Sequence, residues 1–197
     1  MTDRARVLAA PLVAFLFGLV ALGAAAYWAL TYEPRRPGVA NVGGPFTLVA
    51  GDGRTVTERD FKGTPFLVFF GFTHCPDICP TKLQEMSEVF AKLGRQGSKV
   101  RALFITVDPE RDTPEIMKSY VSSFDDRIVG LTGSREEVEK VAKAYRAFAR
   151  RVPTKDGDYT MEHTSLVYLM NRDGLFVGSL NLDRPPEEAA REIAKEL

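Results

Sequence analysis

The sequence predicts an α/β domain with a layered order of strands and helices, preceded by an apolar N-terminal segment. A short aromatic-rich run from Pro65 to Phe72 has the length and composition of a buried strand. Helical spacing follows it and stops at Gly94, with apolar positions at Leu83, Met86, Val89, Phe90 and Leu93. Later segments repeat this alternation, which predicts a sheet with a parallel part and an antiparallel edge.

The N-terminus carries a long apolar segment. No charged side chain occurs from Val7 to Tyr32, and at about 1.5 Å per residue such a helix exceeds the roughly 30 Å hydrocarbon core of a bilayer. Aromatic residues gather near its end, as in an interfacial belt, at Tyr27, Trp28 and Tyr32. We therefore expect residues 1–33 to form one transmembrane helix that anchors the chain. A signal peptide cleaved near Ala24–Ala26 is the alternative, but apolar residues continue to Leu30.

A linker and one folded domain are expected after the anchor. Pro and Gly are frequent from Pro34 to Pro45, which predicts a tether over residues 34–44 and a domain over residues 45–197. The chain carries 26 basic and 26 acidic side chains, of which four basic and two acidic ones precede residue 37. The 22 basic and 24 acidic side chains that remain are not clustered, so nothing indicates a nucleic-acid surface.

Turn and capping signals divide the domain into its elements. Asp52-Gly53 and Asn171–Gly174 indicate hairpins. Thr113 before Pro114, Ser134 before Glu137, and Pro185 indicate helix starts. Strands are expected at residues 46–49, 54–57, 65–72, 100–107, 128–131, 164–170 and 175–180, and helices at 80–94, 113–124, 134–148 and from 185 onward.

The only two cysteines, Cys75 and Cys79, lie in the turn between the first buried strand and its helix. Backbone N–H groups and the helix dipole favour thiolates there, so we expect lowered thiol pKa values. Two thiolates at this spacing can share one soft ion, as Cu(I), zinc and iron–sulfur sites do. The same spacing also allows a disulfide with some local strain. Because both cysteines belong to one motif, they indicate a site rather than a disulfide scaffold.

A dithiol needs a third ligand, and the chain has only two histidines. His74 follows the strand directly before Cys75, where adjacent side chains point to different faces, so a surface position is favoured. His163 precedes a buried strand, in a loop expected beside the cysteine turn. Together with Cys75 and Cys79 it would give a two-thiolate, one-imidazole set, which suits copper in both oxidation states. From spacing alone, an ordinary core or surface role for His163 is an equal alternative.

Three segments of the chain resemble the Sco/SenC family: Gly71–Pro80, Val107–Pro114 and the Glu162-His163-Thr164 triplet. The resemblance covers roughly residues 44–197. It implies a thioredoxin-like fold, a central mixed sheet flanked by helices, in a membrane-tethered copper protein that helps to assemble cytochrome c oxidase. In that family two cysteines and a histidine bind copper, as Cu(I) or Cu(II), which corresponds to Cys75, Cys79 and His163 here.

The resemblance further implies a metallochaperone rather than an enzyme. It would deliver copper to the dinuclear copper site of oxidase subunit II and exchange it with other copper chaperones. One alternative is a thiol–disulfide reductase whose redox-active pair, Cys75 and Cys79, keeps the oxidase cysteines reduced; another is a redox or copper sensor. Three residues between the cysteines, instead of two, argue against an ordinary thioredoxin-type reductase. With no transit peptide, we expect a bacterial inner membrane and a periplasmic domain.

Several other residues near the motifs have expected roles. The family usually has Asp before the histidine, and Glu162 stands there, which leaves its role beside a metal in question. Asp112 is expected to cap the helix that begins near Pro114. Asp108 ends a strand and its role is open, whereas Asp77 is expected to shape the turn between the cysteines. The aromatic residues of the strand are expected to pack in the core or at its rim, and these are Phe66, Phe69, Phe70 and Phe72.

Overall fold

The computed structural model describes residues 18–28 and 42–197. The chain divides into two units, Met1–Gly38 and Val39–Leu197, which are described separately. In the first unit residues 18–28 are helical. Within the described ranges, no helix combines the length and the apolarity that a membrane span requires. Most of the predicted anchor at 1–33 and most of the linker at 34–44 lie outside these ranges, and both stay predictions.

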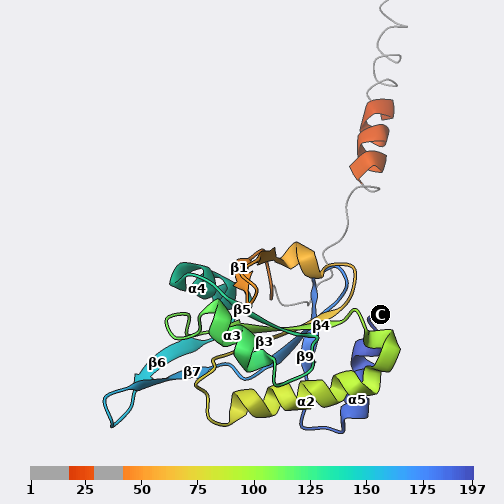
Figure 1. Cartoon of the computed structure of the whole chain (residues 1–197). Helices are drawn as coiled ribbons and strands as arrows, with labels where there is room; N and C mark the ends of the chain where they lie inside the picture. The colour runs from red at the N-terminus through yellow and green to blue at the C-terminus, as the bar shows by residue number, and fades with distance from the viewer. Residues whose placement is uncertain (1–17, 29–41) are drawn as a thin grey trace, which may run out of the picture. The chain divides into compact units, whose positions relative to one another are not determined.

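A seven-stranded mixed sheet forms the centre of the second unit, in the order β2-β1-β5-β4-β3-β8-β9 (Figure 1). The three central strands β3, β4 and β5 run parallel, and the outer strands pair antiparallel. This arrangement confirms the predicted mixed sheet. The strands are β1 (Thr47–Ala50), β2 (Thr55–Thr57), β3 (Phe66–Gly71), β4 (Arg101–Thr106), β5 (Ile128–Thr132), β8 (Val167–Met170) and β9 (Phe176–Leu180).

Helices cover both faces of the sheet. The α-helices are α2 (Ile78–Leu93), α3 (Pro114–Val121), α4 (Arg135–Ala144) and α5 (Pro186–Ala194), and the short 3-10 helices are η1 (Glu58–Phe61) and η2 (Gly94–Gly97). On one face, α5 lies beside α2 (Figure 1). On the same face, the backbone N–H of Asp125, just after α3, donates to Ser87 of α2 at 3.1 Å. On the opposite face, Tyr145 at the end of α4 packs edge-on against Phe70.

The central strand β3 is buried at all six positions, as expected for a parallel strand covered on both faces. Side chains alternate along it, so Phe69 stacks on Phe104 of β4, whereas Phe70 meets Tyr145 and Tyr168 on the other face. Each fully buried phenylalanine contributes roughly 1.5–3 kcal/mol through the hydrophobic effect. The strand therefore gives the cysteine turn that follows it a rigid base.

The region after α4 differs from the prediction. The helix ends at Ala144 rather than near residue 148, and a separate two-stranded hairpin follows, formed by β6 (Ala149–Pro153) and β7 (Tyr159–His163) (Figure 1). Arg146 takes a left-handed conformation with φ of 54°, and the N–H of Ala147 bonds back to the carbonyl of Ala142 at 2.8 Å. This helix-terminating geometry stops α4. The expected helix to residue 148 and the expected loop before Thr164 were therefore wrong.

Candidate metal centre

The two cysteines lie at different depths where β3 leads into α2. Cys75 precedes the helix and is partly exposed, whereas Cys79 is the second helical residue and is fully buried. The backbone N–H of Cys79 donates to the Cys75 sulfur at 3.3 Å. Asp77 is exposed at the helix N-cap position, where its side chain makes no capping bond, and its carbonyl accepts from Thr81 N–H at 3.2 Å. The expected turn-shaping role of Asp77 therefore rests on its backbone.

Gly71 makes room for the Cys79 sulfur. A Cβ atom at this position would lie 2.7 Å from Cys79 Sγ and 2.6 Å from the ring of Phe104. Carbon atoms do not approach so closely without displacing their neighbours. Only glycine at the end of β3 lets the sulfur sit directly on the strand.

His163 lies beside the buried cysteine. It is the last residue of β7, and its Nε2 is 3.6 Å from Cys79 Sγ. Its Nδ1 is 3.0 Å from the carbonyl of Thr164, a contact that places the proton on Nδ1 and leaves the Nε2 lone pair facing the sulfur. The rings of Phe69 and Phe72 pack against the His163 ring in T-shaped geometry, with centroid distances of 6.2 and 5.7 Å.

The three predicted ligands come together. The sulfurs of Cys75 and Cys79 and a ring nitrogen of His163 all lie within 4.8 Å of one another. One soft ion can reach all three atoms, because thiolate and imidazole ligands are those that copper and zinc sites use. The structure thus brings these residues together, and their assignment as ligands stays a prediction at this point.

Burial sets the protonation states of the site. It raises the pKa of the Cys79 thiol well above its ordinary value and lowers the pKa of His163 below 6.5. The expectation that the helix start lowers both thiol pKa values is therefore wrong for Cys79, because desolvation outweighs the helix dipole. At neutral pH the metal-free site holds a protonated Cys79 and a neutral imidazole. Metal binding to Cys79 would release a proton.

Asp112 fixes the loop that carries Cys75. It is fully buried, and its carboxylate accepts from the Thr73 N–H at 3.1 Å, the Thr73 hydroxyl at 2.6 Å and the Thr106 hydroxyl at 2.6 Å. It is not the cap of α3, because the Thr113 side chain accepts the capping bond from Ile116. The expected capping role of Asp112 was thus wrong. The carboxylate instead ties the end of β4 to the segment before the cysteines.

Asp108 connects the strand end to the β6–β7 hairpin. Its buried carboxylate accepts from the Tyr159 hydroxyl at 2.9 Å and from the Arg111 guanidinium. Arg111 also lies 3.8 Å from the centre of the Tyr159 ring and donates to the Tyr159 carbonyl at 3.1 Å. Because Tyr159 and His163 belong to the same strand, this cluster positions the hairpin that carries His163. The role left open for Asp108 is therefore a structural one toward His163.

Two other candidates point away from the site. Glu162 is exposed and pairs with Arg150 at 2.6 Å, on the strand face opposite to its neighbour His163. An outer role beside a metal is therefore excluded in this geometry. His74 is exposed, as predicted, with Nδ1 3.2 Å from the Thr73 hydroxyl. The sequence reasoning did not identify Thr73, Tyr159 or Arg111, because their contacts join segments that are far apart in the chain.

Comparison with known proteins identifies clear relatives. The SCO1/SenC family model matches residues 34–197. The mitochondrial protein SCO1 homolog of Mus musculus is 42% identical over 156 residues, which covers 78% of this chain and 55% of the mouse protein. The corresponding human protein is 41% identical and is covered to 54% of its length. The chain thus spans about half the length of these relatives.

Two solved structures are also similar. The structure of Bradyrhizobium japonicum ScoI with copper bound has 56% sequence identity and a TM-score of 0.76, over 79% of this chain and 99% of that one. BsSco, described as a Sco-family cytochrome c oxidase assembly protein with a disulfide switch, has 30% identity and a TM-score of 0.64, over 81% and 95%. These likenesses confirm the thioredoxin-like α/β fold that the sequence resemblance implied.

Proposed function

The chain belongs to the SCO1/SenC family, and we propose that it is a copper-binding protein of cytochrome c oxidase assembly. In this proposal it is a membrane-anchored chaperone, not an enzyme, that carries copper on Cys75, Cys79 and His163 to the dinuclear copper site of oxidase subunit II. The observation that carries the proposal is the convergence of two sulfurs and one imidazole nitrogen within 4.8 Å. Such a ligand set favours copper over hard cations, and the ScoI relative holds copper.

The unequal depth of the ligands supports transfer by ligand exchange. Cys75 and His163 are partly exposed, whereas Cys79 is fully buried. Incoming ligands of a partner can therefore replace Cys75 and His163 first, while Cys79 holds the ion until the end. When the ion leaves, Cys79 takes up the proton that it lost on loading, because burial favours its neutral form. The metal is coordinated throughout, as Cu(I) or Cu(II).

A copper titration of the full chain in detergent tests the proposal. Followed by absorption, wild type should bind one Cu(II) with strong sulfur-to-copper charge transfer. Cys75→Ser and Cys79→Ser should abolish tight binding, and His163→Ala should weaken it and change the spectrum. His74→Ala is the matched control, because this exposed histidine lies next to Cys75 and should leave binding nearly unchanged. Loss of binding in His74→Ala with none in His163→Ala would overturn the ligand assignment.

A thiol–disulfide reductase is the second candidate, and the same difference in cysteine depth favours it. Cys75 is the more accessible of the two sulfurs and accepts the N–H bond of Cys79, so in this role it would react as the thiolate. That thiolate would attack a partner disulfide and release one partner thiolate. Cys79 would then lose its proton and displace the second, which leaves a Cys75–Cys79 disulfide and a reduced partner. Weak copper binding indifferent to His163, together with rapid cycling of this disulfide, would favour the reductase over the chaperone.

The cellular setting belongs to the same proposal. The uncharged run from Val7 to Tyr32 supports a single-pass anchor in a bacterial inner membrane, with the domain in the periplasm, where oxidase subunit II and other copper chaperones would be its partners. Fractionation of cells followed by protease treatment of spheroplasts tests it. The domain should be degraded from the outside, and recovery of an intact soluble chain in the cytoplasm would contradict the assignment.

A further inference from the structure

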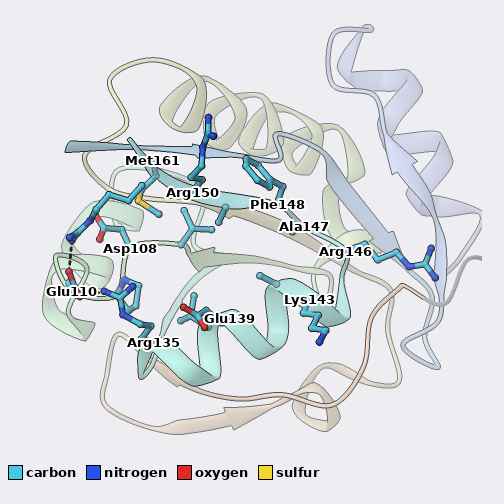
Figure 2. Close-up of a pocket in the computed structure, with 16 residues that line it drawn as sticks. Asp108, Glu110, Arg135, Glu139, Lys143, Arg146, Ala147, Phe148, Arg150 and Met161 are labelled. Atoms are coloured by element: carbon cyan, nitrogen blue, oxygen red, sulfur yellow. Dashed lines mark hydrogen bonds and ion pairs between the residues drawn. The ribbon is translucent and has the colours of Figure 1, made fainter. Parts of the chain in front are cut away.

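A groove of about 550 Å³ lies between α4 and the β6–β7 hairpin (Figure 2). Its apolar lining includes Val138 and Ala142 of α4 and Met161 of β7. Its other side is lined by the consecutive residues 147–151, which lie just before β6 and in its first half. The groove adjoins the metal centre, because Ala149 in this lining is paired in register with His163.

The lining has an excess of positive charge. It contains the basic residues Arg135, Lys143, Arg146, Arg150 and Arg151 against the acidic residues Asp108, Glu110 and Glu139. At one end, Glu110 is neutralised by ion pairs with Arg135 and Arg151. At the other end, Lys143 and Arg146 are exposed and have no ion-pair partner in the described part of the chain (Figure 2). Phe148, on the hairpin side of the groove, is 55% exposed (Figure 2).

Arg146 occupies a position where the backbone favours glycine. Its φ of 54° makes it the one non-glycine residue with positive φ among the described residues. Side chains with a Cβ are strained in this conformation, and helices that end in this way usually have glycine there. A strained residue that glycine would relieve is a signal of function. Position 146 carries an arginine despite this backbone strain, and its guanidinium places a positive charge at the rim of the groove.

The groove also presents a free strand edge. Within the described ranges β6 pairs with β7 and with no other strand. The N–H of Thr164 donates to the carbonyl of Phe148, so in an antiparallel ladder the backbone groups of Ala149 and Arg151 face away from β7. An extended peptide can pair with such an edge as an added strand.

We propose that this groove binds an extended acidic segment of the protein that exchanges copper with the site, an inference that rests on the proposed function. The segment would pair with the edge of β6, direct acidic side chains to Lys143 and Arg146, and cover Phe148 with an apolar side chain. Because Ala149 is the register partner of His163, a segment bound here would hold the partner's own ligands beside the metal centre. The groove is concave and lies beside a strand edge, which fits a peptide better than a flat anionic surface.

Fluorescence anisotropy of a labelled ten-residue peptide with alternating Glu and Val and one Phe tests this inference. The full metal-free chain in detergent should bind it, and added salt should weaken the binding. Lys143→Gln and Phe148→Ser should each reduce the affinity for the peptide. For Lys143→Gln we expect a loss of about threefold, as for an exposed ion pair that salt screens. Lys140→Gln is the matched control, since Lys140 is on the same helix but lines a different cavity, and it should have no effect.

Arg146→Gly gives the sharpest result, because its two effects have opposite signs. Removing the strained Cβ should raise the melting temperature by about 2 °C, whereas removing the cation should weaken peptide binding by about threefold. A merely structural Arg146 would change only the melting temperature. Unchanged peptide binding in Arg146→Gly, or equal binding of a Lys-for-Glu peptide, would overturn the proposal. The proposal would also be overturned if the wild-type chain self-associates and Arg146→Gly abolishes this association. In that case a second copy of the chain, not a partner's segment, would occupy the groove.

The test separates this inference from the proposed function. Peptide binding is measured without metal, and copper binding is measured without peptide. If Arg146→Gly and wild type bind copper alike but neither binds the peptide, the groove proposal fails and the copper site stands. If the peptide binds as expected and no copper does, the proposed function fails instead, and with it the identity of the segment as a copper partner.

Discussion

The two sides of the metal centre are held in different ways. The cysteine side is fixed from within, because Asp112 is fully buried and its three hydrogen bonds join Thr73 to Thr106 below the turn. Buried hydrogen bonds to a charged group are among the stronger ones in proteins. The segment before Cys75 is therefore tied to the core through Thr73.

The histidine side is held by the buried Asp108–Arg111 pair at one point and by surface contacts elsewhere. The ring of Tyr159 lies between the guanidinium groups of Arg111 and Arg151, at 3.8 and 3.5 Å from its centre, and Arg150 pairs with Glu162 in solvent. Exposed ion pairs contribute little and are screened by salt. The candidate metal centre thus combines a firmly held pair of sulfurs with an imidazole nitrogen on a more exposed hairpin.

The largest effect is expected from Asp112→Ala, which breaks the rigid side. It leaves the N–H and hydroxyl of Thr73 and the hydroxyl of Thr106 without their acceptor, and we expect a loss of about 3 kcal/mol in the free energy of unfolding. Denaturant unfolding followed by circular dichroism measures it. Asp173→Ala, at an exposed turn position, is the control and should change stability little. A loss below that of an ordinary surface substitution would contradict the assignment of a rigid side.

Asp108→Ala should act on the other side, with a smaller effect of about 2 kcal/mol on stability, because the largely buried Arg111 loses the closer of its two carboxylate partners and keeps only the exposed Asp158. Amide hydrogen exchange shows where the effect falls. Exchange should accelerate in β7, whose Tyr159 hydroxyl loses its acceptor, and stay unchanged in α2. Equal acceleration in both elements would mean that the two sides form one cooperative unit.

Acid should loosen the histidine side, with a smaller effect than either substitution. Burial lowers the pKa of His163 in the folded protein below its ordinary value of 6.5. The unfolded chain therefore binds this proton more readily, and stability is lost as the pH falls from 6.5 through the folded-state pKa. Thermal unfolding of the metal-free chain between pH 7.5 and 5 measures this loss. His163→Asn should show a shallower dependence, and an identical slope in both proteins would contradict it.

The smallest effect is expected from the exposed pair of Arg150 and Glu162. Glu162→Ala removes an ion pair whose side chains are 63% and 51% exposed, so stability should change by about 0.5 kcal/mol or less. Copper binding, measured by the charge-transfer absorption, should not change, because Glu162 points away from the site. A clear loss of copper affinity would mean that Glu162 acts on the metal site, contrary to its orientation in the structure.

Elements with a buried face could be predicted from the sequence, and elements without one could not. The apolar run at residues 65–72 became β3, and the helical spacing after Pro80 became α2. The capping box predicted from Ser134 and Glu137 is present at the start of α4. β6 has no such signal, because four of its five residues are exposed. Its Ala and Arg residues favour helices, so the helix was extended over the turn that Arg146 makes.

The site shows the same division. The convergence of Cys75, Cys79 and His163 was predictable from their scarcity and from the family resemblance. The raised pKa of Cys79 was not, because the helix start is a local feature and the burial depends on packing against distant segments. The carboxylate contacts of Asp112 likewise reach 39 residues back to Thr73, and spacing within one motif says nothing of such a partner.

The close approach at Gly71 affects how variants of this chain should be interpreted. Any other residue there would push on the sulfur of Cys79, so, under the proposed function, a screen for lost copper delivery would select position 71 alongside the three proposed ligands. The cause would be a steric clash between the new side chain and Cys79, yet the loss of copper delivery would resemble that of a ligand substitution. Total copper content would not distinguish the two cases, whereas a shift of the charge-transfer band would, because a displaced sulfur still binds. Spectra of such variants therefore separate ligand geometry from ligand identity.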